Sequence, residues 1–259
     1  KDKIRIKLHM AGEGRRDILI LAGERINEAT YYWKAGNPSG FAMQMRKYLS
    51  NRPVEKIEQH DFDRIVKIFF PEHVIIAELF PRGKIVFCDR DMEILGATEF
   101  EEYKDRSIKR GSKYKFPEAG ASISEIDYDK FVDILSEFKD SPIVSIMAKE
   151  FNMGGFHSEE ICLRASVDKN KEIGSLSDDE LIDLHREMKD LLDSEKSPGI
   201  VFKNDEKEDV VPIDYLKYKD LEKDEYDSFN HALDIFYGKE AMKEAQKKKK
   251  KSYNKEKNK

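Results

Sequence analysis

A run of basic and aromatic residues near the middle of the sequence offers the clearest chemistry. Between residues 104 and 115, six Lys or Arg residues stand against one Asp, and aromatic residues flank or interrupt the run. Cations neutralise phosphates and aromatic faces stack on unpaired bases, so this mixture suits structured or looped RNA. A solvated strand edge, kept from aggregating by its charges, explains the composition equally well. The residues concerned are Tyr103, Arg106, Lys109, Arg110, Tyr114 and Phe116.

Two further groups of cations lie earlier in the sequence. Lys or Arg occupies positions 1, 3, 5 and 7 and apolar residues occupy positions 4, 6 and 8, so a strand would carry these cations on one face. Arg46 and Lys47 stand side by side in a segment of helical spacing, and Arg52 follows shortly after. Both groups could contact phosphates, and a solvated face is the ordinary alternative.

An Asp–Arg pair, Asp63 and Arg64, directly precedes an apolar strand-like run at residues 65–68. An Asp beside an Arg can orient the guanidinium for bidentate contact with a phosphate or a base edge. The ordinary alternative is a salt bridge at the end of a strand. Composition alone does not choose between the two.

The familiar signatures of catalysis and metal binding are absent from the sequence. It contains no nucleophile elbow, Walker loop, HExxH motif or paired CxxC, and its six His residues are scattered without ligand spacing. Gly12 and Gly14 suit a hairpin turn better than a dinucleotide-binding loop, because the third glycine and the helix of that motif do not follow. We therefore expect no metal and no cofactor.

The two cysteines, Cys88 and Cys162, fall in segments that are typical of a buried strand and a buried helix. A disulfide framework is not indicated, and a reducing cytoplasm is the expected location. No run of about 18 apolar residues is present, so we expect no transmembrane span and no membrane partner.

The formal charge of −5 is distributed unevenly over the 259 residues. Residues 1–118 carry 23 Lys and Arg against 19 Asp and Glu, residues 119–238 carry 14 against 30, and residues 239–259 carry 10 against 3. Binding depends on where cations cluster rather than on their total. The acidic total therefore does not exclude a nucleic-acid partner.

Short strands dominate the expected structure of residues 1–118. Residues 1–10 and 17–22 predict a hairpin, and residues 41–49, after the turn and cap signal Asn37–Ser39, predict one helix. Further strands are expected at 54–59, 63–69, 73–80, 84–89 and 93–96. This spacing favours an antiparallel sandwich or barrel with one embedded helix.

Helical spacing replaces the strand pattern after Pro117. We expect a helix at 128–138, a helix capped by Ser141-Pro142 that ends near residues 153–155, and a helix capped at Ser158. Ser177 and Glu180 form a capping-box pattern for a longer helix. Strands are expected at 198–202 and 209–213, and a helix at 229–236 leads into the Lys-rich end. The Gly-Gly hairpin could present backbone N–H groups to phosphate, or be purely structural.

Seven sequence blocks in a fixed order span nearly the whole chain. They are Gly23–Ile26, Pro38–Met43 with Arg46–Leu49, Asp63–Val66, Glu78–Gly83, Gly154–Ala165, Asp209–Ile213 and Ser228–Asp234. These blocks resemble the NFACT-N domain of the RqcH and nuclear export mediator factor family, which is also described as fibronectin-binding protein A-like. The lineage looks archaeal.

The resemblance implies an α+β fold. Its first part is an antiparallel β-sandwich resembling the N-terminal domain of formamidopyrimidine-DNA glycosylases, at residues 1–118, without the family's N-terminal helix, which would precede Lys1. A helical helix-hairpin-helix domain is expected at 119–196. Return strands and a helix that pack on the first domain are expected at 197–238, and the start of a coiled-coil arm at 239–259.

The resemblance also implies a role in ribosome-associated quality control. Family members bind tRNA and the obstructed large ribosomal subunit with its peptidyl-tRNA, and they direct an untemplated C-terminal tail, alanine-rich in archaeal-type members, onto the stalled chain. The ribosome makes the peptide bonds, so this protein is expected to position tRNA and not to be an enzyme. The family's Asp-Arg motif falls on Asp63 and Arg64, and Arg25, Arg46 and Lys47 lie in family blocks. With Arg106, Lys109 and Arg110 they complete the expected tRNA-binding residues.

Two other functions compete with this interpretation. A sandwich followed by a hairpin module also suits a DNA glycosylase, which would use an N-terminal amine and an acid that this chain does not show. The family's older name suggests a fibronectin-binding adhesin. The sequence shows no export signal that would support adhesion.

Overall fold

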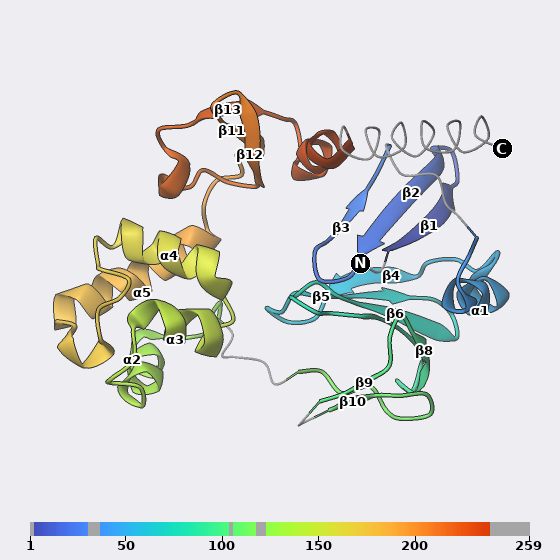
Figure 1. Ribbon diagram of the computed structural model, residues 1–259, viewed down its shortest axis with the longest axis horizontal. Helices are drawn as coiled ribbons and strands as arrows, with labels where there is room; N and C mark the ends of the chain where they lie inside the picture. The colour runs from blue at the N-terminus through green and yellow to red at the C-terminus, as the bar shows by residue number, and fades with distance from the viewer. Residues whose placement is uncertain (1–2, 31–36, 104–105, 118–122, 239–259) are drawn as a thin grey trace, which may run out of the picture. The chain divides into compact units, whose positions relative to one another are not determined.

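The computed structural model describes residues 3–30, 37–103, 106–117 and 123–238, and these divide into two compact units. The first unit comprises Lys1–His60, Arg64–Pro117 and Asp227–Lys259. The second comprises Asp61–Asp63 and Glu118–Tyr226. Each unit has its own hydrophobic core and is described by itself (Figure 1).

The first unit begins with an antiparallel sheet in the order β1-β2-β3, formed by β1 (Lys3–Met10), β2 (Gly14–Leu21) and β3 (Arg25–Glu28). The predicted hairpin is confirmed, with Lys3 opposite Leu21 and Met10 opposite Gly14. Gly12 and Gly14 have φ values of 83° and 88°, which glycine adopts without steric cost, so the turn falls where the glycines predicted it. β3 was not predicted from the sequence.

A five-stranded antiparallel sheet follows in the order β4-β5-β6-β7-β8. Its strands are β4 (Lys56–Gln59), β5 (Ile65–Phe69), β6 (His73–Glu78), β7 (Ile85–Asp89) and β8 (Ile94–Ala97). All five predicted strands are present, and none of their ends is shifted by more than two residues. The predicted helix is α1 (Gly40–Leu49), and Ser39 caps it by accepting a hydrogen bond from the N–H of Ala42 at 3.2 Å.

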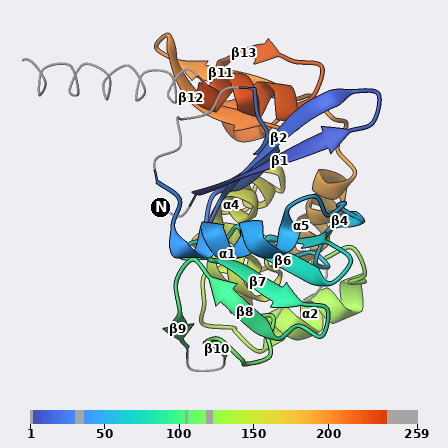
Figure 2. The same cartoon turned by 90° about the vertical axis from the view of Figure 1, so that its right-hand side faces the viewer.

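The five-stranded sheet buries both of its faces, because side chains alternate along each strand. Ile75 and Ala77 of β6 pack in one cluster with residues of β2 and α1, whereas Val74 and Ile76 pack in a second cluster on the other face. The second cluster is covered by the segment that holds the short strands β9 (Glu101–Glu102) and β10 (Ser107–Ile108). Figure 2 shows α1 lying along the sheet. The expected antiparallel sheets and the one helix packed against them are thus present in this unit.

The second unit contains α2 (Tyr128–Ser136), α3 (Ile143–Glu150), α4 (Gly154–Arg164) and α5 (Asp178–Leu192), with the 3₁₀ turn η1 (Ile173–Ser175) before α5. The predicted capping box is confirmed: the N–H of Glu180 donates to Ser177 Oγ at 3.3 Å, and the N–H of Ser177 donates to Glu180 Oε2 at 2.8 Å. The unit ends in a sheet of order β12-β11-β13. It consists of β11 (Gly199–Lys203), β12 (Glu206–Val211) and β13 (Glu222–Glu225), with the 3₁₀ turn η2 (Leu216–Tyr218) between the last two.

Three expectations for this half of the chain differ from the structure. Helix α4 begins at Gly154, so Ser158 does not cap it but lies in its second turn, where its hydroxyl donates to the carbonyl oxygen of Gly154 at 2.8 Å. Pro142 itself is the N-cap of α3 and provides no side-chain cap. Strands β11–β13 group with the second unit, since Val201, Val211 and Tyr215 pack in its core, and only the helix from residue 229 groups with the first.

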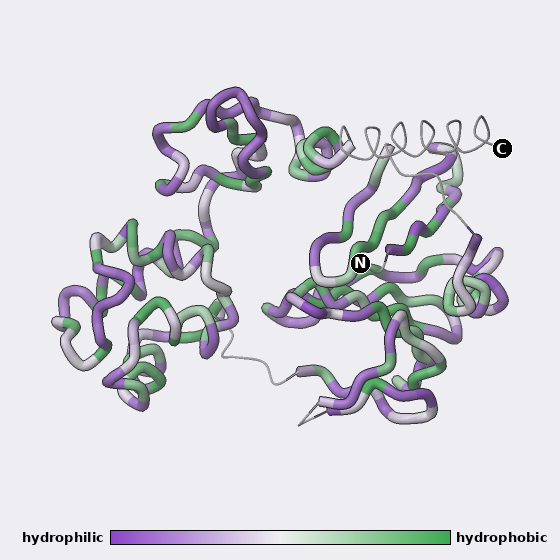
Figure 3. The backbone as a smooth tube through the Cα atoms, in the orientation of Figure 1, coloured by the Kyte–Doolittle hydropathy of each residue, from purple (hydrophilic) through white to green (hydrophobic). Residues whose placement is uncertain are grey.

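The hydropathy of the residues differs between the five-stranded sheet and the strands near the end of the second unit. In Figure 3 the strands of the five-stranded sheet are mostly apolar in colour, whereas the segment around β12 and β13 is mostly hydrophilic. No helix within the described ranges is long and apolar enough to cross a membrane. The expected coiled-coil start at 239–259 lies outside the residues that the structure describes.

Candidate functional site

Asp63 and Arg64 lie in the connection between β4 and β5. The N–H of His60 donates to the carbonyl oxygen of Ile65 at 2.9 Å, and the Arg64 carbonyl oxygen accepts from the N–H of Leu79 at 2.7 Å. Asp63 is 5% exposed, whereas Arg64 is exposed. The exposed Arg64 side chain can therefore contact a partner molecule, whereas the buried Asp63 carboxylate can only contact groups of the protein itself.

The boundary between the two units falls at this pair. Asp61–Asp63 group with the second unit and Phe62 packs against its core, while Arg64 belongs to the first unit. The chain passes from one unit to the other between the two residues of the motif.

Arg25 is held inside the first unit. Its guanidinium lies over the Tyr237 ring, 3.4 Å from the centroid, pairs with Glu24 and donates from Nε to Asn27 Oδ1 at 3.2 Å. Burial lowers the pKa of Arg25 from its ordinary value, against the opposing charge of Glu24. These contacts tie β3 to the helix from residue 229, which is a structural role.

Arg106 is a correction to the expected binding surface. It is 8% exposed, and its Nη1 donates to Glu78 Oε1 at 2.5 Å, beside the Tyr114 hydroxyl, which donates to the same oxygen at 2.8 Å. Burial acts to lower the pKa of Arg106, but the hydrogen bond and charge of Glu78 outweigh it and the pKa is raised. Burial and Glu78 also raise the pKa of Tyr114. Arg106 is thus a core cation that neutralises a buried carboxylate.

Lys109 and Arg110 follow Arg106 on the surface. Lys109 pairs with Glu102 at 2.5 Å, both side chains being more than half exposed, and the hydrogen bond from Lys109 lowers the pKa of Glu102. Such exposed pairs are weak and exchange readily with solvent or a ligand. Arg110 is exposed and forms no ion pair with a described residue. The basic run therefore divides into an inward and an outward part.

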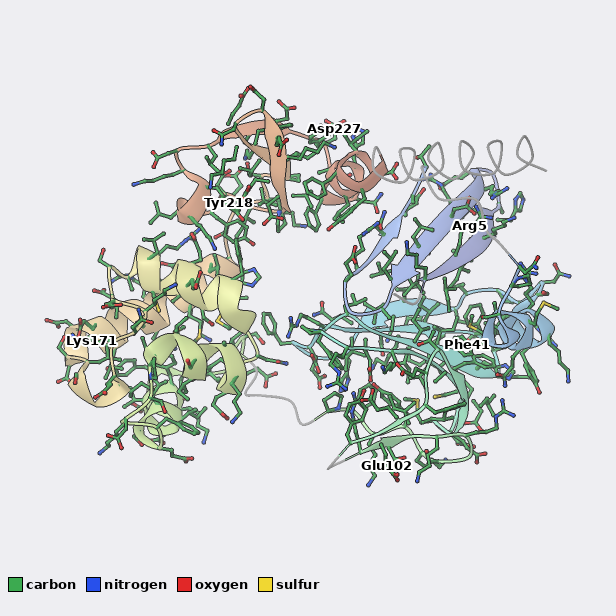
Figure 4. The ribbon with its side chains drawn as sticks, in the orientation of Figure 1. Arg5, Phe41, Glu102, Lys171, Tyr218 and Asp227 are labelled. Atoms are coloured by element: carbon green, nitrogen blue, oxygen red, sulfur yellow. The ribbon has the colours of Figure 1, made fainter. Side chains whose placement is uncertain are left out.

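Arg46 and Lys47 are both exposed in the last turn of α1, but they border different hollows. Arg46 and Arg52 line a groove of about 2050 Å³ together with β1, whose cationic residues Lys3, Arg5 and Lys7 also line it. Arg5 is labelled in Figure 4. Lys47 instead shares a depression of about 670 Å³ with Arg110.

The depression also contains residues that the sequence did not single out. Met43, Tyr48 and Phe100 line it and are exposed by 52%, 38% and 51%, respectively. The i, i+4 spacing of α1 predicts that residues 43 and 47 share a side of the helix, and likewise residues 44 and 48. No local pattern predicts that residues 100 and 110 join them.

The second unit is organised around a buried carboxylate of its own. Glu160 on α4 has no exposed surface, accepts from Arg164 Nε at 2.7 Å, and accepts from the backbone N–H groups of Leu216 and Lys217 at 2.7 and 3.0 Å. The first turn of α4 contains no acidic residue. Whether the α3–α4 hairpin grips a nucleic-acid backbone stays a prediction.

Three of the histidines and both cysteines make contacts or are buried within their own unit. His157 contacts the Tyr215 hydroxyl at 3.1 Å, His185 contacts the carbonyl oxygen of Ile126 at 3.3 Å, and His73 stacks on Phe87. Cys88 and Cys162 are buried free thiols, and burial raises their pKa to about 12 and about 11. Within the described ranges no group of three or more His, Cys, Asp or Glu residues could hold a metal ion.

Comparison with solved structures shows the fold. The fibrinogen-binding protein from Staphylococcus aureus superposes with a TM-score of 0.68 at 16% identity, covering 91% of this chain and 88% of that one. The N-terminal part of the fibronectin/fibrinogen-binding protein from Streptococcus suis gives 0.65 at 17% identity, covering 91% and 87%. The expected resemblance to formamidopyrimidine-DNA glycosylases stays a prediction.

Comparison of sequences shows the family. The archaeal Rqc2 homolog aRqcH of Methanocaldococcus jannaschii is 36% identical over 266 residues, which cover 97% of this chain and 39% of that protein. The mouse ribosome quality control complex subunit NEMF is 24% identical over 260 residues, covering 86% and 24%. This chain thus spans well under half of these relatives. Residues 1–259 match the family described as NFACT N-terminal and middle domains, and the chain belongs to that family.

Proposed function

We propose that this chain is the tRNA-binding portion of a ribosome quality control factor. The whole protein would bind tRNA and the obstructed large ribosomal subunit carrying peptidyl-tRNA, and direct untemplated alanine-type tailing of the stalled chain. It acts in the cytoplasm as a positioning factor and not as an enzyme, because the ribosome makes each peptide bond. It requires no cofactor or metal.

The observation that carries this proposal is the similarity over nearly the whole chain to a relative named as an archaeal Rqc2 homolog. The relative from mouse is named as a subunit of the ribosome quality control complex. The distribution of exposed cations on the first unit supports an RNA partner, since phosphate contacts supply most of the affinity for RNA.

The exposure of each side chain decides which of the expected residues we keep in the tRNA-binding surface. Arg64, Arg46 and Lys47 are exposed and available to phosphates, as are Lys109 and Arg110 at the end of the basic run. Asp63 supports the motif from within the protein because its side chain is buried. Arg25 and Arg106 are engaged by their own unit, so we leave them out of the tRNA surface.

The test compares two arginine replacements in the full-length protein. Arg64→Ala should reduce the amount of co-purifying tRNA and the length of alanine tails on a stalled reporter. Arg186→Ala removes the same charge from an exposed position on α5 and should change neither. Sequencing RNA crosslinked to the wild-type protein identifies the RNA that is bound.

The proposed role of Arg64 is wrong if Arg64→Ala leaves both tRNA recovery and tailing at the wild-type level. The proposed function itself is wrong if the wild-type protein crosslinks to no tRNA on isolated large subunits.

A further inference from the structure

The depression beside α1 combines exposed apolar side chains with two cations and has no acidic lining residue. It is lined by three of the eight large hydrophobic side chains that are exposed among the described residues: Met43, Tyr48 and Phe100. Its rim carries two cations, Lys47 and Arg110, and none of its lining residues is acidic. Exposed apolar groups that gather in a hollow mark a binding site more often than single exposed residues do.

The charge of this rim is not compensated locally. The acids that flank Phe100 in the sequence are committed elsewhere: Glu99 pairs with Lys84 at 2.5 Å, Glu101 with Arg82 at 2.7 Å, and Glu102 with Lys109. Neither Lys47 nor Arg110 forms an ion pair with any residue in the described ranges. The rim therefore attracts an anion.

The floor of the depression is held firmly. Gly96 of β8 lies against α1 so closely that a Cβ atom there would be 2.3 Å from Gln44 Oε1 and 3.2 Å from the Phe41 ring. Gln44 Nε2 also donates to the carbonyl oxygen of Leu95 at 2.8 Å. Figures 1 and 2 both show α1 beside β8, and Figure 4 labels Phe41 on this helix. A site built on a helix and a strand holds its contact groups in place before the ligand arrives.

We propose that this depression binds one unpaired nucleotide of an RNA, which deepens the proposed function and rests on it. The base packs against Phe100, Tyr48 and Met43, and the phosphates lie against Lys47 and Arg110. A hollow of about 670 Å³ is of the size that small ligands occupy. A regular duplex would present only phosphates and leave the apolar side chains uncovered, so an unstacked nucleotide suits the site better.

The occupant follows from complementarity of charge and shape. Aromatic and apolar faces accept any base, while two cations on one rim favour the backbone on either side of it. A hydrophobic protein segment would cover the apolar groups but not use both cations. It is therefore the alternative that the experiment must distinguish.

The test uses the full-length protein and measures its affinity for two RNAs. One is a single-stranded oligouridylate, and the other is a hairpin whose only unpaired bases are those that form its turn. Phe100→Ala should weaken oligouridylate binding about tenfold with an unchanged salt dependence, because stacking is lost and no phosphate contact is. Lys47→Ala and Arg110→Ala should each make the negative slope of log K against log salt shallower by about 0.7, because each removes one phosphate contact. Phe100→Tyr keeps the ring and should restore binding.

Leu163→Ala, which truncates an exposed apolar residue on α4, and Arg186→Ala serve as controls of matched type and should leave binding unchanged. The proposal is overturned if Phe100→Ala and Arg110→Ala bind the oligouridylate as the wild type does. It is also overturned if these variants lose association with the large subunit while binding of the oligouridylate is unchanged, since a protein segment is then the occupant. The Arg64→Ala variant is measured in parallel. If it loses tRNA while the nucleotide site fails its test, the proposed function stands and only the proposal for the depression is wrong.

Discussion

The two units each bury one glutamate completely, Glu78 in the first and Glu160 in the second, but they neutralise it in different ways. Glu78 accepts hydrogen bonds from Arg106 and Tyr114, which lie 28 and 36 residues further along the chain, and from the backbone N–H of Lys84 at 2.9 Å. Glu160 depends on Arg164, one helical turn away, and on two backbone N–H groups that begin η2. Both carboxylates thus hold backbone N–H groups, but Glu78 takes its cation from a distant segment of the chain and Glu160 takes its cation from the same helix.

This difference explains why the basic run at 104–115 is divided. The first unit balances the buried Glu78 with Arg106, whereas Lys109 and Arg110 of the same run are exposed. The second unit obtains its cation locally, from an arginine that is still 19% exposed. A run of like charges on one segment therefore serves two separate tasks.

The largest effect is expected when Glu78 loses its cation. Arg106→Met should lower the free energy of unfolding by about 3–5 kcal/mol, because it leaves a buried carboxylate without its ion pair. Lys109→Met removes the same charge from an exposed pair only three residues away and should cost no more than about 1 kcal/mol. Chemical denaturation of both variants measures the difference. Equal losses in the two would show that Glu78 and Arg106 are not coupled as the structure indicates.

A smaller and more local effect is expected at Glu160. Glu160→Gln keeps the shape but removes the charge, and Arg164 can turn toward water, so the loss should be about 1–3 kcal/mol. Amide hydrogen exchange should accelerate first at Leu216 and Lys217, because their N–H groups donate hydrogen bonds to the Glu160 carboxylate. The exposed neighbour provides the control: Glu159→Gln should leave both amides protected. Uniform acceleration throughout the second unit would mean that Glu160 holds the whole core and not only η2.

Sequence patterns predicted the elements whose stability is local. The alternation of β1, the Ser39 cap of α1 and the capping box of α5 all depend on neighbours within a few residues, and all are present. Strands β3 and β13 were not predicted, because their sequences, RINE and EKDE, show no apolar alternation. β13 is held by backbone pairing with β11, from Gly199 opposite Glu225 to Phe202 opposite Glu222, and a pairing partner cannot be read from the strand itself.

The candidate site could be predicted only in part for the same reason. The cationic character of 104–115 was visible, but which cation points inward was not. One signal was present in the sequence: residue 108 is an apolar Ile, and in an extended segment residue 106 lies on the same face as residue 108. In the structure Ile108 is 1% exposed. The meeting of Lys47, Phe100 and Arg110 has no such local signal, because it depends on how α1 lies against β8.

The smallest effect, and the one that separates charge from shape, is expected at the capping box. The hydrogen bond from Lys171, followed by that from the Ser177 N–H, lowers the pKa of Glu180 below its ordinary value of 4.5. A carboxylate with a lowered folded-state pKa stabilises the protein above pH 4.5, and this contribution is lost as the pH falls through the lowered value. Glu180→Gln can keep the capping geometry, so it should cost only a few tenths of a kcal/mol at neutral pH and flatten the acid limb of the stability curve. Lys171→Met should shift the carboxyl titration of Glu180 upward while leaving the cap intact, as NMR would detect. An unchanged titration would mean that the Ser177 N–H alone lowers the pKa, so that in this half-buried pair, unlike the buried one at Glu78, the cation contributes little.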